Sequence, residues 1–130
     1  MRVRFTSVQL QKLQWLGNAD RGWAAALIIL ARAFPNSREA WQAVVLQRPV
    51  PYLDFEPVLE RYWSSTERYL LRFAAHFAGG QTPISLYDAL QFLDDSQVAT
   101  LLEAIQTFRG TKQFVAADQL SDSATSSLSS

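Results

Sequence analysis

The 130-residue sequence contains no cysteine. This absence excludes a disulfide framework, a cysteine-ligated zinc or iron–sulfur site and a thiol nucleophile. It also fits a reducing compartment, and we expect a cytoplasmic localisation. A chain of this length suits one domain and buries about two-thirds of the surface that its unfolded form exposes, so folding requires neither a metal nor a cross-link.

Long apolar runs and familiar catalytic motifs are also missing. The most apolar run covers residues 23–31, which is much shorter than the ~20 residues that a membrane-spanning helix needs. We therefore expect no membrane contact and interpret this run as a buried helix rather than a signal peptide. The GxSxG turn and the glycine-rich phosphate loops do not occur, so we predict no bound cofactor.

The sequence contains a single histidine, His76. On a helical projection it lies beside Arg72 and Tyr69, next to the polar side. No Glu or His stands three or four residues away, as a helical metal site would require. Glu56 and Glu60 are spaced to share a helix side, but such a pair is usually solvated. We predict no catalytic residue and no metal ligand, and an enzyme built around His76 is the weakest alternative that we consider.

Apolar residues, 48% of the chain, recur at helical spacing between capping signals. Thr6, Ser64 and Asp94 each stand three residues before a Gln or Glu, which is the spacing of a capping box. The predicted helices cover about 7–16, 21–33, 37–46, 55–62, 65–78, 86–93 and 95–109. We therefore predict an all-α protein, a single compact bundle of six or seven helices centred on residues 21–33 and 65–78.

Glycines mark the predicted helix ends at Gly17, Gly79 and Gly110. In the last two predicted helices, the apolar residues form stripes that we expect to point into the core. These residues are Leu86, Ala89, Leu90, Leu93, Val98, Leu101, Leu102, Ile105 and Phe108.

Apolar periodicity stops after Phe114, and six of the last eleven residues are serine. Such a segment buries too little apolar surface to offset the entropy cost of ordering it. We predict a helical domain over residues 1–115 and a disordered, serine-rich tail over residues 116–130.

The stretch "RPVPYLDFEPVLERYW" combines prolines with aromatic and arginine side chains. Aromatic residues and arginine are enriched at the centres of protein interfaces, although the same rings would also serve to pin a loop to the core. We predict a non-catalytic protein-interaction module, an adaptor, regulator or self-associating protein, that binds another protein or a second copy. Its candidate contact residues are Arg48, Tyr52, Phe55, Arg61, Tyr62 and Trp63. Trp15 is a second candidate.

Charge is divided unevenly along the chain. Residues 1–76 carry ten Lys or Arg and six acids, and residues 77–130 carry two and six. The alternative function is therefore a nucleic-acid-binding regulator that uses the arginine-rich half. However, residues 94–108, the second helix of a possible helix-turn-helix, contain acids and no Lys or Arg, and an acidic recognition helix is repelled by DNA. We favour pairing of the two halves inside the fold over nucleic-acid binding.

Overall fold

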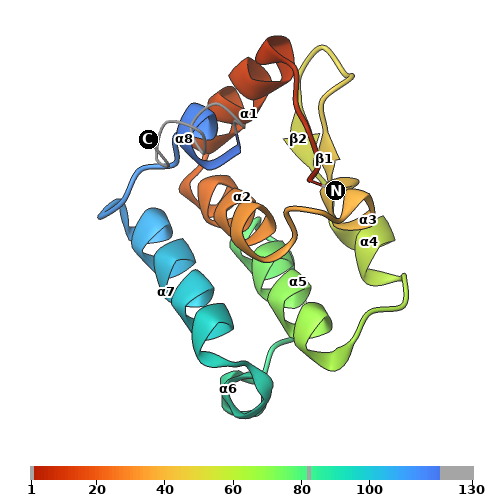
Figure 1. Ribbon diagram of the computed structural model, residues 1–130, viewed down its shortest axis with the longest axis vertical. Coiled ribbons are helices and arrows are strands. Elements are labelled where there is room, and N and C mark those ends of the chain that lie inside the picture. The colour runs from red at the N-terminus through yellow and green to blue at the C-terminus, as the bar shows by residue number, and fades with distance from the viewer. Residues whose placement is uncertain (1, 82, 121–130) are drawn as a thin grey trace.

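The computed structural model describes residues 2–81 and 83–120 (Figure 1). These residues form eight helices and a two-stranded hairpin, so the predicted all-α class is confirmed. The elements are α1 Ser7–Ala19, α2 Arg21–Ala33, α3 Arg38–Trp41, β1 Val44–Val45, β2 Tyr52–Leu53, α4 Glu56–Leu59, α5 Ser65–Phe77, α6 Leu86–Phe92, α7 Asp95–Arg109 and α8 Ala116–Leu120. Over the described ranges, no helix combines the length and the apolar character needed to cross a membrane.

The core is built around α2, which lies in the middle of the molecule and contacts α1, α5, α7 and α8 (Figure 1). Every residue from Ala24 to Ala31 is buried. A helix that is apolar on all sides must be surrounded by other elements to be stable in water. The prediction of a buried helix at residues 21–33 is therefore confirmed, with both of its bounds.

Most helix starts follow from their capping residues. The side chains of Thr6, Ser64 and Asp94 each accept a hydrogen bond from the third backbone N–H of their helix, and all three capping boxes are complete. Gly79 and Gly110 have the positive φ angles, 96° and 83°, that end helices in the left-handed conformation. The predictions of these helix starts and of the helix ends at Gly79 and Gly110 are confirmed.

The prediction that Gly17 ends the first helix is wrong. The helix continues to Ala19 and meets α2 at Asp20, whose extended backbone separates the two helices and whose carboxylate caps the second one. Gly17 instead lies against the ring of Phe114, where a Cβ atom would be only 2.5 Å from the Cδ2 atom. The glycine is explained by this close approach of the later chain segment and not by a turn.

The third and fourth predicted helices are shorter than expected. The third helix ends at Trp41 rather than Leu46, because the chain then enters β1, which pairs antiparallel with β2. The β-branched Val44 and Val45 suit a strand, and the loop containing the two prolines brings the partner strand alongside. The fourth helix ends at Leu59, so the segment up to residue 62 is not helical.

The structure differs from the prediction of a tail at residues 116–120. These residues form α8, whose Ala116 and Leu120 side chains are buried. The Gln14 side chain on α1 fixes the approach to α8: it donates a 3.0 Å hydrogen bond to the carbonyl of Phe114 and accepts a 2.7 Å one from the Ala116 N–H. The rest of the predicted tail, residues 121–130, lies outside the described residues.

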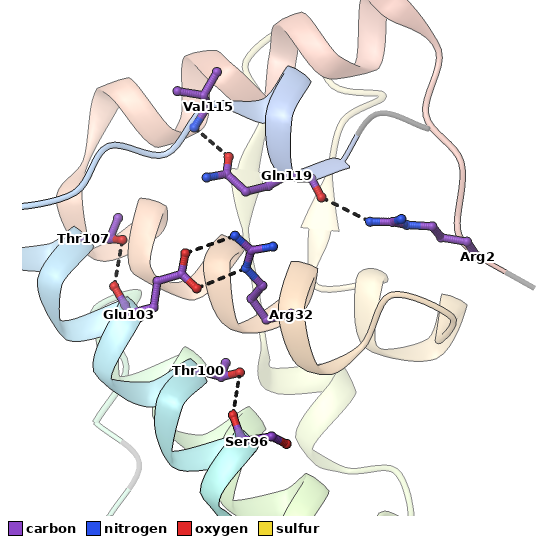
Figure 2. Close-up of polar contacts among 8 residues, drawn as sticks. All are labelled: Arg2, Arg32, Ser96, Thr100, Glu103, Thr107, Val115 and Gln119. Carbon is purple, nitrogen blue, oxygen red and sulfur yellow. Dashed lines mark hydrogen bonds and ion pairs between the residues drawn. The ribbon is translucent and has the colours of Figure 1, made fainter. Parts of the chain in front are cut away.

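Figure 2 shows two polar contacts that join distant segments, together with local contacts within α7 and around α8. The Arg32 side chain of α2 makes two hydrogen bonds, of 3.0 and 3.2 Å, with the Glu103 carboxylate of α7. Arg2 donates a 3.3 Å hydrogen bond to the carbonyl of Gln119. The pair between Arg32 and Glu103 is an example of the expected contact between the basic and the acidic parts of the chain.

Candidate protein-binding surface

The surface predicted at residues 48–63 is only partly present, because two of its rings belong to the core. Phe55 and Trp63 are 5% and 8% exposed. The Trp63 indole N–H donates a 2.8 Å hydrogen bond to the carbonyl of Val58, and its ring packs edge-on against Phe34 with 6.0 Å between centroids. Phe55 and Trp63 therefore hold this segment onto the core, and their prediction as contact residues is wrong.

The other four predicted contact residues are exposed and lie in three places. Arg48 is in the hairpin loop, Tyr52 is on β2, and Arg61 and Tyr62 follow α4. Arg61 donates a 2.7 Å hydrogen bond to the side chain of Gln42. Tyr62 is 91% exposed, the highest value among the large apolar side chains of the described residues. The expected aromatic cluster is therefore reduced to two exposed tyrosines.

The main concentration of exposed apolar side chains lies elsewhere, on α6 and α7. In the described residues, twelve large apolar side chains are exposed, and seven of them are on these two consecutive helices. We call these seven the α6–α7 apolar surface. They are Leu86, Tyr87, Leu90, Phe92, Leu102, Ile105 and Phe108.

On α7, the apolar residues cover two sides of the helix. Leu101, Ala104 and Thr107 are buried, and the residue directly after each of them is large, apolar and between 41% and 55% exposed. Successive residues differ by about 100° around a helix axis, so Leu102 and Ile105 form a second apolar side that is turned away from the buried one. The buried side packs mainly on α2. Phe108 lies one turn after Ala104 and shares its side of the helix, but it is exposed at the end of α7, where its ring centroid lies 5.7 Å from that of Phe77.

On α6, only Ala89 is buried. Leu86 and Leu90 are one turn apart and share a side of the helix. Phe92 stacks on Tyr69 of α5, with 5.9 Å between the ring centroids and 14° between the ring planes. The prediction that Leu86 and Leu90 point inward is therefore wrong, and it is wrong in the same way for the three exposed residues of α7.

The charges near this surface change sign along α7. Residues 82–108 contain Asp88, Asp94, Asp95 and Glu103 and no Lys or Arg, whereas Arg109 and Lys112 follow at the other end. The backbone N–H of Gln97 and then the Ser96 hydroxyl lower the pKa of Asp94, so this carboxylate is charged at neutral pH. The start of α7 is therefore acidic and its end is basic.

The basic residues of the first half are distributed over several elements. Arg2, Arg4 and Arg38 line a hollow beside Trp41. Two further arginines, at positions 68 and 72, line a hollow beside Phe92. Nucleic-acid binding through these residues stays a prediction that the geometry does not test.

His76 is exposed in the last turn of α5, next to the polar side as expected. Within residues 2–81 and 83–120, no three His, Asp or Glu side chains are grouped so that they could hold a metal ion. Glu56 and Glu60 are both exposed. The prediction that the protein has no catalytic activity stays a prediction.

Comparison of the chain with known protein families gave no match. No curated protein and no solved structure matched it either. The function of the chain is therefore inferred from its own surface. Periodicity in the sequence does not identify the α6–α7 apolar surface, because its residues have the spacing of core residues. The sequence feature that points to an exposed surface is that α7 carries more apolar residues than one packed side of a helix requires.

Proposed function

We propose that the protein is a non-catalytic interaction module, acting in the cytoplasm, and that it binds a protein through the α6–α7 apolar surface. The observation that carries this proposal is the gathering of seven exposed large apolar side chains within residues 86–108. Scattered exposed apolar residues are normal on protein surfaces, whereas grouped ones mark interaction sites. Within this set, Leu86 and Leu90 share a side of α6, and Leu102 and Ile105 share a side of α7.

The chemistry of the surface supports a protein as its ligand. Tyr87, Phe92 and Phe108 supply three aromatic rings, and aromatic residues are enriched at the centres of interfaces. Aliphatic Leu102 and Ile105 lie between Phe108 and the start of α7. Exposed Asp88 and Asp95 lie among these residues in the chain, so the surface combines apolar and charged side chains, as protein interfaces generally do.

The experiment is a co-purification from the native host, with a surface variant and a matched control. The variant is Leu102→Gln with Ile105→Gln, because glutamine keeps the size and helix propensity of these exposed positions. The control is Val8→Gln on α1, where the side chain is 58% exposed. Circular dichroism first confirms that all three proteins are folded. We expect a partner, or an untagged second copy, to be retained by the wild type and the control and lost from the double variant.

The retained protein is then purified and its dissociation constant with each variant is measured. A wild-type protein that retains nothing and sediments as a monomer contradicts the proposal. Equal affinity of the partner for the wild type and the double variant contradicts it as well. In that second case Tyr62→Ala tests the surface predicted from the sequence, since Tyr62 is its most exposed aromatic residue.

A further inference from the structure

We infer that the α7 part of this surface binds a second copy of the chain, with the two α7 helices antiparallel about a two-fold axis near Leu102. The inference rests on the proposed function and names its partner. Two features carry it: the spacing of the apolar residues along the outer side of α7, and the charges at the two ends of that same side.

The outer side of α7 has the spacing of a helix-pairing seam. Val98, Leu102 and Ile105 are separated by four and then three residues, which is the alternation found where two helices pack along their length. Leu102 and Ile105 are 55% and 41% exposed, and Val98 is partly buried. Asp95 and Arg109 continue the same side, because each lies seven residues, about two turns, from Leu102.

The charges at the ends of this seam are self-complementary. Asp95 and Arg109 are both exposed. Antiparallel pairing about Leu102 places Asp95 opposite the partner's Arg109, and the two-fold axis repeats this pair at the other end. Asp94 adds to the acidic end of the seam and Lys112 to the basic end. Parallel pairing would place like charges opposite each other, which is unfavourable.

A second copy fits this pattern better than a partner of one charge sign. A two-fold interface uses the same patch on both subunits, so the patch must complement itself. The α7 seam does so, with an apolar centre and opposite charges at equal distances on its two sides. A partner helix that is uniformly basic or uniformly acidic would meet a like charge at one end.

The first test is sedimentation of the full chain over a dilution series. We expect the wild type and Val8→Gln to show a reversible equilibrium between monomer and dimer, and Leu102→Gln with Ile105→Gln to remain a monomer. A wild type that is monomeric at every concentration overturns the inference. So does a dimer that the double variant leaves intact, or a series of species larger than a dimer, because a two-fold contact closes on itself.

The second test exchanges the charges of Asp95 and Arg109. It distinguishes the loss of a specific pairing between the two α7 helices from a general loss of protein stability. Asp95→Lys alone and Arg109→Glu alone should each raise the dimer dissociation constant by about tenfold or more, because both symmetry-related pairs become repulsive. Mixing the two variants should restore dimers that contain one chain of each kind. Both substitutions in one chain should also restore the dimer. Failure of both rescues overturns the antiparallel arrangement.

Failure of this inference is distinguishable from failure of the proposed function. If the purified chain is a monomer but a different protein is retained from the host and lost from the Leu102→Gln and Ile105→Gln variant, the inference fails and the proposed function stands. If neither a dimer nor a retained partner depends on these residues, both fail.

Discussion

α2 and α7 both carry more apolar residues than one packed side requires and lie side by side, yet their surroundings differ. α2 contacts α1, α5, α7 and α8, so every side of it is covered. α7 packs mainly on α2 and touches α5 to a lesser extent, so its second apolar side remains exposed. The difference shows that apolar periodicity identifies the residues that favour burial. It does not identify the neighbour that covers them, and that neighbour can belong to another molecule.

The largest expected effect comes from the same truncation made in the two helices. Leu27→Ala removes a fully buried side chain from α2 and should lower the free energy of unfolding by about 2–5 kcal/mol. Leu102→Ala removes a side chain that is 55% exposed and should cost less than about 1 kcal/mol. Urea unfolding of dilute, monomeric protein measures both values. Equal losses would show that Leu102 is part of the core and would contradict the comparison.

A smaller effect is expected from Gly22→Ala, which tests how closely α2 is surrounded. A Cβ atom at this position would be 1.9 Å from the backbone oxygen of Phe77, so α2 and α5 would have to move apart. We expect a loss of about 1–3 kcal/mol or more in the free energy of unfolding. Gly17→Ala is the matched control. Its added Cβ atom would contact the side-chain ring of Phe114 and not a backbone atom. If Gly22→Ala lowers the free energy of unfolding less than Gly17→Ala does, the close packing described for α2 is contradicted.

Removing one capping residue at a time compares a core helix with a surface helix. Ser64→Ala removes the cap of α5 and should lower the free energy of unfolding by about 1 kcal/mol. Ser85→Ala removes the cap of α6 and should lower it less, because a helix that buries little can open locally without unfolding the rest. Hydrogen exchange should show faster exchange in α6 than in α5 in the wild type. The reverse order would show that α6 is an integral part of the core.

The smallest effect concerns the ion pair that joins α2 to α7. Arg32 and Glu103 are 3.0 Å apart, with side chains that are 46% and 19% exposed. A double-mutant cycle with Arg32→Gln and Glu103→Gln should give a coupling of about 0.2–1 kcal/mol that decreases as salt is added. A coupling above that range at high salt would mean that the pair, and not apolar packing, holds α7 to α2.

The candidate site was predicted only in part, because burial depends on contacts between distant residues. Phe55 and Trp63 have the composition of interface residues, but Phe34 and the carbonyl of Val58 bind Trp63 inside the protein. Tyr62, the residue just before Trp63, is almost fully exposed. No pattern in the residues 48–63 separates these outcomes, since the core that receives Trp63 is formed by other helices.

The order of amino acids alone could predict the helical class, the buried central helix and the positions of the helix caps. It could do so because a cap or a helical stripe depends on residues within a few positions of one another, as at Thr6, Ser64 and Asp94. Contacts in the folded chain settle three further points: Val44 and Val45 pair in a strand, residues 116–120 fold against α1, and one apolar side of α7 is left uncovered by the residues that the structure describes. Each of these outcomes depends on which distant segments meet, and local spacing does not contain that information.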